Sequence, residues 1–413
     1  MFPLSKLFSG LIRTGTLTVT DAEGRRHVFG GAPGPSAHVR LHDKALYWKL
    51  FVNPELHGGE AYMDGTMTFP DSSLRDFMVL FAVNKSRMHD QQQIKALNVL
   101  DRAMKGVQQA NPIGKAQKNV AHHYDVGNAL YEMFLDEGMF YSCAYYRDEA
   151  ETLEQAQINK CRLIAAKLGL KPGQRVLDIG SGWGGLARYL ARVAEVEVLG
   201  VTLSKEQYAL ATARTEAEGL SDQVKFQLVD YREVMGPFDR IVSVGMFEHV
   251  GVGHYDEFFR KVHDLLAPEG VMLLHSIGKM SPPATASRWL RKYIFPGGYA
   301  PSLSEVFPMT ERNRLWVTDV EFLRLHYAWT LEAWWRRFEA RRDEVRAMYD
   351  ERFCRMWEFY LLGCEMMFRS GAQEVFQMQL SRRRDASPLT RDYIFTEQER
   401  LKAIEAAAGI GAA

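Results

Sequence analysis

One stretch of the chain constrains the fold more than any other, and it reads Arg-Val-Leu-Asp-Ile-Gly-Ser-Gly-Trp-Gly-Gly-Leu over residues 175–186. Val176, Leu177 and Ile179 form a short apolar run that is typical of a buried parallel strand. Glycines follow at once, and an amphipathic helical pattern begins at Leu186. Strand, glycine turn and helix together are the opening unit of a doubly wound sheet, which binds ligands at the carboxyl ends of its strands.

The spacing of the glycines distinguishes this loop from other nucleotide-binding loops. A phosphate loop would end in Gly-Lys-Ser/Thr, and dinucleotide loops read G-x-G-x-x-G. Here Gly180, Gly182 and Gly184 read G-x-G-x-G, and the acidic residue Asp178 precedes them. This pattern resembles motif I of the S-adenosylmethionine-dependent methyltransferases. The alternative is an ordinary tight turn after a strand.

Strands and helices alternate through the rest of the second part of the chain. Further strands are expected over 196–201, 224–229, 238–244, 271–274, 317–325 and 375–380, and helices over 153–168, 204–219, 255–266 and 330–369. This alternation predicts an α/β domain with a doubly wound, mostly parallel seven-stranded Rossmann-like sheet. Polar residues that follow the strands should then line one edge of the sheet.

The first part of the chain reads as a separate, smaller α+β domain. Residues 17–29 suggest a hairpin with its turn at 21–24, and 38–41 a further strand. A helix over 73–88 should be capped by Asp71 or Ser72, and its apolar face suits either a core or a lipid contact. The expected organisation is an N-terminal domain over 1–110, a linker over 111–118, a catalytic domain over 119–395 and a tail over 396–413, frayed from 403.

Composition narrows the class of protein. Hydrophobic residues make up 46% of the chain, charged residues 25%, and the formal net charge is +0. This is typical of a soluble globular protein, with no overall field that would favour nucleic acid. The four cysteines form no Cys-x-x-Cys pair, so we expect no metal site and a reducing compartment. No signal peptide or membrane span is visible, which favours a cytoplasmic protein that meets membranes only at the surface.

Further motifs resemble those of the cyclopropane-fatty-acyl-phospholipid synthase family, which includes the mycolic acid cyclopropane synthases. They are Tyr141-Ser142-Cys143-Ala144-Tyr145, Leu177 to Gly185, Gly200 to Ser204 with Gln207, Phe247-Glu248-His249, Leu274 to Ile277, Phe295 to Gly298 and His326-Tyr327-Ala328. Gly58 to Gly65 resembles part of the extra domain of the bacterial phospholipid enzymes. The resemblance covers nearly the whole chain.

The resemblance implies a cofactor and an anion. S-adenosylmethionine would be held by Tyr141, Ser142, Val176, Asp178, Gly180, Gly182, Trp183, Gly184, Thr202, Leu203, Gln207, Tyr231 and Arg232. Bound bicarbonate would be the base, in a catalytic set of Cys143, Glu248, His275, Ile277, Tyr327 and Cys364. One departure is Ser181, where the family often has cysteine. Helix packing is the preferred reading of Cys364, because the reaction needs no thiolate.

The implied reaction makes strict demands on the site. A cis alkene in a lipid chain attacks the methyl group of a sulfonium. Because the alkene has no lone pair, its alignment with the methyl group must supply much of the rate. The resulting cation loses a proton to the base as the ring closes, and water must be excluded. Aromatic faces can stabilise the cation. Ionised Glu248 cannot donate a hydrogen bond, so it would accept the bicarbonate hydroxyl or orient His275. Without the resemblance, Glu248 could be a helix cap or surface acid, His275 a core histidine and Cys143 a small buried residue.

Alternative functions remain. A fatty-acyl C-methyltransferase with a methyl-branched or methylene product, or a small-molecule methyltransferase, would carry the same cofactor motif, and a silent lipid-binding protein is a third reading. The expected partner is the unsaturated acyl chain of a phospholipid at the membrane surface, with a homodimer as a further possibility. Arg288, Arg291 and Lys292 beside Trp289 and Tyr293 suit either an anionic membrane interface or a solvated helix.

Overall fold

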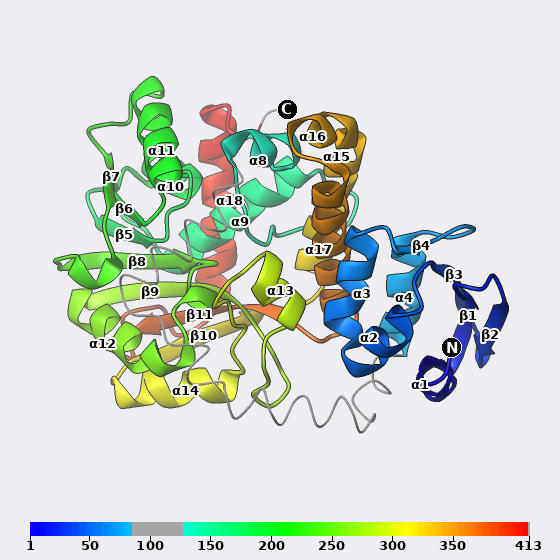
Figure 1. Cartoon of the computed structure of the whole chain (residues 1–413). Helices are drawn as coiled ribbons and strands as arrows, with labels where there is room; N and C mark the ends of the chain where they lie inside the picture. Colours follow the sequence, from blue (N-terminus) through cyan, green and yellow to red (C-terminus); the bar gives the residue numbers. More distant parts are fainter. Residues whose placement is uncertain (85–126, 412–413) are drawn as a thin grey trace. The chain divides into compact units, whose positions relative to one another are not determined.

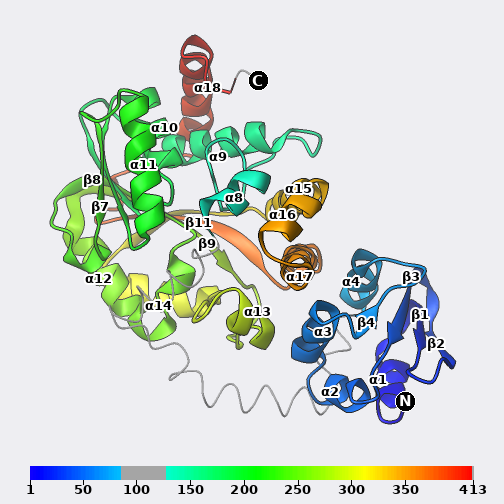
Figure 2. The ribbon, with the colours of Figure 1, turned by 45° about the horizontal axis from the view of Figure 1, so that its top comes forward.

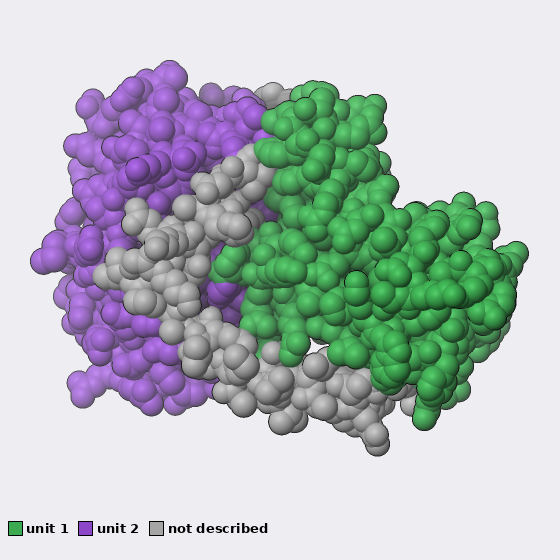
Figure 3. All heavy atoms as spheres, viewed as in Figure 1, with its two compact units in different colours: residues 1–108, 284–296, 331–372 green, residues 109–283, 297–330, 373–413 purple. Residues whose placement is uncertain are grey.

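The computed structural model describes residues 1–84 and 127–411, and the chain forms two compact units (Figures 1 and 3). The first unit holds residues 1–108, 284–296 and 331–372, and the second holds 109–283, 297–330 and 373–413. The expected linker over 111–118 and the expected start of the catalytic domain at 119 lie outside the described residues. The predicted domain boundaries, which divide the chain into consecutive segments, therefore stay a prediction. Each of the two compact units instead combines three segments that are distant in the sequence.

The N-terminal part of the first unit is a small sheet covered by helices. Its strands are β1 (Thr14–Thr20), β2 (Arg26–Gly30), β3 (Ala32–Leu41) and β4 (Met67–Thr68), in the order β2-β1-β3-β4. The predicted hairpin is confirmed as β1 and β2, and β3 runs parallel to β1. The helices are α1 (Leu4–Leu11), α2 (Leu46–Val52), α3 (Pro54–Met63) and α4 (Leu74–Val83). The expected α+β character is thus present.

The cap of α4 differs from the expectation. Ser73 is the N-cap, and it forms a capping box with Asp76, so neither Asp71 nor Ser72 has that role. The hydroxyl of Ser72 instead accepts a hydrogen bond from the backbone of His38 at 2.9 Å. Phe77 packs against the apolar core of this unit, which supports the core reading of the helix face. The end of the expected helix, beyond residue 84, lies outside the described residues.

The Gly-Gly-Glu motif seats a helix from a distant part of the sequence. A Cβ on Gly59 would lie 2.3 Å from the indole nitrogen of Trp289, so only glycine allows this close approach to α13 (Arg288–Tyr293). Glu60 accepts hydrogen bonds from Lys292 at 2.6 Å and from the hydroxyl of Tyr293 at 3.0 Å. Trp289 is buried. Trp289 therefore serves packing within the first unit, which is against the membrane-interface reading for that residue. For Lys292, which is exposed, and for Tyr293 the membrane-interface reading stays a prediction. Helices α16 (Arg342–Met348) and α17 (Glu351–Arg369) complete that unit.

The second unit contains the predicted seven-stranded sheet (Figures 1 and 2). The strand order is β10-β11-β9-β8-β5-β6-β7. The strands are β5 (Arg175–Ile179), β6 (Glu197–Thr202), β7 (Val224–Leu228), β8 (Phe238–Val244), β9 (Leu266–Gly278), β10 (Trp316–Phe322) and β11 (Glu374–Ser381). Five neighbouring strands, from β9 to β7, are parallel, and β11 is antiparallel to both of its neighbours. The predicted doubly wound, mostly parallel sheet is confirmed.

Alternate residues of the central strands feed two apolar cores. Val176 and Val242 pack in one core with α9 (Leu153–Leu168), α10 (Gly185–Ala194) and α18 (Asp392–Ala407). Their chain neighbours Leu177 and Ile241 pack in the other core with α12 (Tyr255–Leu265) and α14 (Leu303–Arg312). Because successive side chains of a strand point to opposite faces, helices on both faces bury the whole strand.

Strand β9 is longer than the expected 271–274. It continues through His275 and Ile277 to Gly278, because β11 pairs with it over that whole length, from Ser381 opposite Val271 to Glu374 opposite Gly278. His275 and Ile277 therefore belong to the strand and do not follow it. Their positions are fixed by a hydrogen-bonded ladder rather than by a loop.

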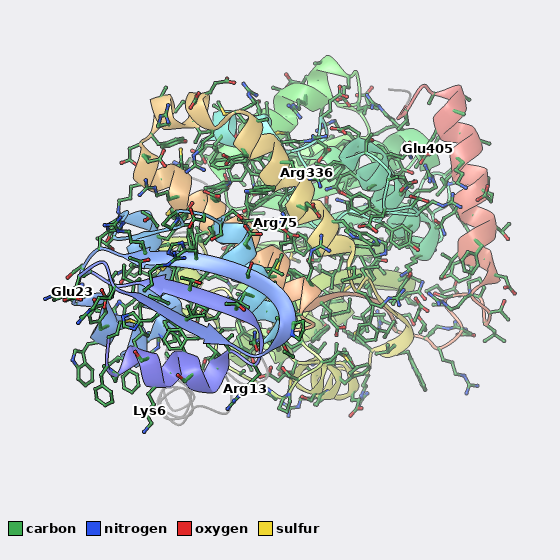
Figure 4. All side chains as sticks on the ribbon, turned by 90° about the vertical axis from the view of Figure 1, so that its right-hand side faces the viewer. Lys6, Arg13, Glu23, Arg75, Arg336 and Glu405 are labelled. Carbon is green, nitrogen blue, oxygen red and sulfur yellow. The ribbon has the colours of Figure 1, made fainter. Side chains whose placement is uncertain are left out.

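The expected C-terminal tail over 396–413 is wrong for residues up to Ala407, because α18 forms there and packs against α9. Glu405, labelled in Figure 4, is buried in an ion pair with Arg162, whose Nε lies 3.0 Å from both carboxylate oxygens. The hydroxyl of Tyr189 donates to the same carboxylate at 2.6 Å. In the sequence, a glutamate among alanines reads as a surface residue, and only its distant partners make it a core residue.

Candidate active site

The glycine loop after β5 has the backbone that its sequence requires. Gly180, Gly182 and Gly184 have φ angles of 83°, 54° and 78°, which favour glycine. A Cβ on Gly180 would lie 2.8 Å from the Cβ of Met246, whereas a Cβ on Gly182 would meet nothing within 4 Å. Gly182 thus has a conformation that favours glycine, and its lack of a side chain leaves open space beside the backbone. This is the cradle that a cofactor would need at the carboxyl end of β5.

Asp178 supplies a buried acceptor next to this cradle. Its Oδ2 atom is buried and has no hydrogen-bond partner among the described residues. Burial raises the pKa of this carboxyl to about 7, and the nearby Lys160 opposes that rise. An unpartnered buried carboxylate is costly unless a ligand satisfies it, and an ammonium group would do so.

Lys160 is a site residue that the sequence did not reveal. It lies on α9 and is almost fully buried, and its ammonium donates to the hydroxyl of Ser142 at 3.0 Å. It also lies 3.8 Å from the ring centroid of Phe140. Burial lowers the pKa of this lysine. One signal was available, because Lys160 is four residues before the buried Ile164 and shares its helix face.

Aromatic rings surround the glycine loop. The ring of Tyr131, on α8 (Asn128–Phe134), lies 5.0 Å from Trp183 and 5.1 Å from Tyr141 between centroids. The indole nitrogen of Trp183 donates to the side chain of Asn128 at 2.8 Å. Two predicted cofactor residues, Tyr141 and Trp183, are thus brought together. Tyr131 and Asn128, which support them, were not predicted.

The ends of the next two strands also carry predicted residues. Thr202 ends β6, and its hydroxyl donates to the amide oxygen of Gln207 at 2.8 Å. The amide N–H groups of Gln207 remain available as donors to a ligand. Beyond β7, Arg232 binds Asp230 through Nε at 2.8 Å and Nη2 at 2.7 Å, and Tyr231 lies between them in a one-turn helix. A ligand that binds Asp230 would have to share this carboxylate with Arg232.

Glu248 and Ile277 meet at the candidate anion site. Glu248 lies in the one-turn helix η2 (Phe247–His249), and its Oε1 accepts the backbone N–H of Ile277 at 2.6 Å. Its Oε2 is buried and has no partner among the described residues. Burial raises the pKa of this carboxyl to about 7. Since Glu248 already holds the Ile277 N–H, an anion that uses this donor must share it with the carboxylate.

His275 is two residues before Ile277 on β9 and is buried as a neutral ring. Burial lowers its pKa to about 3, and the ammonium groups of Lys160 and Lys167 act in the same direction. Its Nδ1 lies 3.1 Å from the amide nitrogen of Gln377. A neutral imidazole can donate one hydrogen bond and accept one.

Cys143 and Tyr327 lie on segments that the structure ties together. The backbone N–H of Ala144 donates to Thr330 at 3.0 Å, and that of Tyr146 donates to the Nδ1 of His326 at 3.0 Å. Tyr327 is in the first turn of α15 (His326–Ala340). Burial raises the pKa of the Cys143 thiol, so it stays protonated.

Cys364 belongs to the first unit, on α17, whereas the other five members of the predicted catalytic set belong to the second. Burial raises the pKa of its thiol to about 12. A thiol in this state is not a nucleophile, which agrees with the packing reading. Within residues 1–84 and 127–411, no group of three His, Cys, Asp or Glu side chains could hold a metal ion. No helix of those ranges has the length and apolar character to cross a bilayer.

The sheet order and the glycine cradle define an S-adenosylmethionine-dependent methyltransferase. Comparison with known proteins identifies the group within this class. The chain belongs to the mycolic acid cyclopropane synthetase family, whose model matches residues 113–378.

Three relatives illustrate this membership. The cyclopropane-fatty-acyl-phospholipid synthase of Escherichia coli (strain K12) is 39% identical over 86% of this chain and 89% of its own. The tuberculostearic acid methyltransferase UfaA1 of Mycobacterium tuberculosis is 41% identical over 65% of this chain and 66% of its own. The crystal structure of the mycolic acid cyclopropane synthase CmaA1, complexed with SAH and CTAB, superposes with a TM-score of 0.62 at 36% identity and covers 66% of this chain and 99% of that one.

Proposed function

We propose that this enzyme transfers the methyl carbon of S-adenosylmethionine to the cis double bond of an unsaturated phospholipid acyl chain and forms a cyclopropane, with bound bicarbonate as the base. The observation that carries the proposal is the buried Glu248, which holds the Ile277 N–H with one oxygen and has no hydrogen-bond partner for the other among residues 1–84 and 127–411. The E. coli relative, a cyclopropane-fatty-acyl-phospholipid synthase, supports the substrate class.

The residues around the glycine loop fit the cofactor. When bound, S-adenosylmethionine supplies an electrophilic methyl group on a sulfonium. Asp178 would accept from its ammonium group, and Ser142, supported by Lys160, would donate to its carboxylate. Gln207 would donate to the ribose, and Tyr231 would pack on the adenine. The open space beside Gly182 supports this arrangement, since a backbone without a side chain can be approached closely.

The anion-site residues fit bicarbonate by the chemistry of their donors and acceptors. A carboxylate at Glu248 would accept the bicarbonate hydroxyl and so leave the anionic oxygens available to take a proton. Neutral His275 and the hydroxyl of Tyr327 would donate to those oxygens. Burial of Glu248 and His275 keeps water from this part of the site. The aromatic rings of Tyr141 and Trp183 would stabilise positive charge, by about 2 kcal/mol or more when desolvated.

We expect incubation with S-adenosylmethionine and unsaturated phospholipid vesicles to add one methylene to each modified acyl chain. Mass spectrometry and NMR of the released fatty acids would show a saturated product with a cyclopropane ring. Vesicles of fully saturated phospholipid are the control and should give no product. Removal of dissolved carbon dioxide should lower the rate, and added bicarbonate should restore it. Folded protein that binds the cofactor and gives no product would contradict the proposal.

A second candidate is a fatty-acyl C-methyltransferase with a methyl-branched or methylene product. The 41% identity to a tuberculostearic acid methyltransferase favours this alternative. Such an enzyme would resolve the cation differently, without closing the ring. The NMR spectrum of the product separates the two candidates, because ring protons are absent from a branched or methylene product.

We also propose that the enzyme works in the cytoplasm, peripheral to the inner face of the membrane, and forms a homodimer. A substrate held in a bilayer supports the surface location, since the described helices do not cross a membrane. In the vesicle assay the protein should sediment with the lipid. Protein that stays in the supernatant at low salt would contradict the membrane association, and a monomer mass in light scattering would contradict the dimer.

We expect Lys160→Met to weaken S-adenosylmethionine binding by about 10- to 100-fold, because loss of a charged hydrogen-bond donor costs about 1.5–3 kcal/mol. Isothermal calorimetry would measure the affinity, and circular dichroism would confirm the fold. Lys171→Met is the matched control, since Lys171 is exposed just after the same helix. Affinity within twofold of the unmodified enzyme would remove Lys160 from the cofactor site.

A further inference from the structure

Three buried polar side chains form a chain of contacts behind the candidate anion site. The ammonium of Lys167, on α9, donates to the amide oxygen of Gln377 at 2.8 Å. The amide nitrogen of Gln377, on β11, lies 3.1 Å from the Nδ1 of His275. All three residues are at most 2% exposed. Water therefore cannot easily replace any of these partners, and each contact must be satisfied within the protein.

The sheet fixes this geometry. His275 and Gln377 stand directly opposite each other in the antiparallel pair of β9 and β11, where side chains of opposed residues lie on the same face. Lys167 is held from a second side by Glu321 of β10, whose carboxylate is 2.6 Å from the ammonium. Asp319 of the same strand is 3.7 Å away. Burial lowers the pKa of Lys167, and the carboxylates of Glu321 and Asp319 oppose that effect and favour the charged ammonium.

The charge of Lys167 determines the orientation of every group that follows. An ammonium offers three donors and no acceptor, so Gln377 must present its amide oxygen to it. The amide nitrogen of Gln377 then faces the ring of His275 as a donor. His275 can accept that bond only if Nδ1 carries no proton. A neutral ring in this position therefore carries its single proton on Nε2.

We propose that Lys167 and Gln377 are positioning residues that hold His275 as the neutral Nε2–H tautomer, so that His275 can only donate a hydrogen bond to a bound anion and cannot accept the proton of the reaction. The claim that His275 donates to a bound anion rests on the proposed function. The claim that His275 is the Nε2–H tautomer is independent of that function. With Nδ1 occupied as an acceptor and Nε2 protonated, the ring has no basic site to offer. The proton must then pass to the anion that Glu248 orients.

Nitrogen-15 NMR of histidine-labelled enzyme tests the tautomer directly. In the unmodified enzyme, the His275 resonances should show a protonated Nε2 and an unprotonated Nδ1. In Gln377→Glu, the new carboxylate can only accept, so the proton should move to Nδ1. Activity should then fall about 100-fold, the size expected for loss of one preorganised donor to an anion. The affinity for S-adenosylmethionine should be unchanged.

Gln379→Glu is the matched control. Gln379 is a buried glutamine on the same strand, but it contacts the backbone oxygen of Lys167 and the hydroxyl of Tyr393 rather than His275. It brings the same charge near Lys167 and should leave the tautomer of His275 in place. Lys167→Met is a second variant, in which Gln377 loses its orienting charge and the His275 spectrum should show both tautomers.

The outcomes test the tautomer of His275 separately from its role as a donor to the anion. A protonated Nδ1 in the unmodified enzyme would overturn the proposal without any variant. So would a Gln377→Glu enzyme that folds and keeps the Nε2–H tautomer. A shifted tautomer with unchanged activity would overturn the role of His275 as a donor. An unmodified enzyme that shows the expected tautomer but forms no cyclopropane would contradict the proposed function alone.

Discussion

Replacement of Glu248 by glutamine is expected to lower kcat by about 100- to 10,000-fold, the range typical of a group that controls proton transfer. The amide is nearly isosteric and can still accept the Ile277 N–H with its oxygen. Its NH₂ group, however, would donate where the carboxylate must accept the hydroxyl of bicarbonate. The anion would then bind poorly or with its proton on the wrong oxygen. Single-turnover assays on vesicles with saturating S-adenosylmethionine would measure the effect.

The pH dependence of the rate gives a sharper test of the same residue. Burial raises the pKa of Glu248 to about 7, so the carboxylate is present above that pH and lost below it. With saturating cofactor, kcat/KM for the lipid should rise with pH and level off above about 7, and Glu248→Gln should lack this rise. Glu233→Gln is the matched control, because Glu233 is an exposed acid in η1 (Tyr231–Glu233), a one-turn helix that also follows a parallel strand. A Glu248→Gln enzyme within fivefold of the unmodified rate would refute the role assigned to this carboxylate.

Replacement of Glu405 by alanine is expected to lower the free energy of unfolding by about 3–5 kcal/mol, since it leaves a buried charge unpaired. Arg162 would lose its carboxylate partner, and the hydroxyl of Tyr189 would lose its acceptor. Urea denaturation followed by circular dichroism would show a lower midpoint. The double replacement Arg162→Leu with Glu405→Leu should recover much of the loss, because both charges are then absent.

Glu397→Ala is the control for this prediction. Glu397 lies on the same helix and pairs with its neighbour Arg400 at the surface. Surface pairs contribute about 0–1 kcal/mol, so this variant should unfold close to the unmodified protein. If Glu405→Ala and Glu397→Ala unfold at the same urea concentration, the buried pair has no special importance for stability.

The sheet could be predicted because its signals are local. The run of Val176, Leu177 and Ile179 needs no partner to be recognised as a buried strand, and the later strands repeat that signal. The glycine loop was equally local, because the backbone of Gly180 and Gly182 lies in the left-handed region that favours glycine. The end of β9 has no local signal in the sequence. Its extension through His275 depends on pairing with β11, about a hundred residues later in the chain.

The candidate site was predicted in part for the same reason. Glu248 and Ile277 were expected at one edge of the sheet from the strand order, and the structure joins them by a hydrogen bond. The buried cations Lys160 and Lys167 were missed, because the burial of a charge depends on partners that only tertiary structure supplies, and the helix face that Lys160 shares with Ile164 is a weak signal. The frayed tail was wrongly predicted for the same reason, since the burial of α18 also depends on distant partners. The remaining assignments to cofactor and bicarbonate stay predictions.

The position of β11 also bears on how the enzyme is made. This strand lies between β9 and β10, so β10 has no neighbour within the seven-stranded sheet until residues 374–381 have been synthesised. A nascent chain that has not yet reached residue 374 would contain the glycine loop, but its His275 would still lack Gln377 across the ladder. Premature termination just before this strand should yield a product that retains the cofactor cradle sequence and is nevertheless inert. The synthesis of residues 374–381 thus decides whether the polypeptide can become a catalyst.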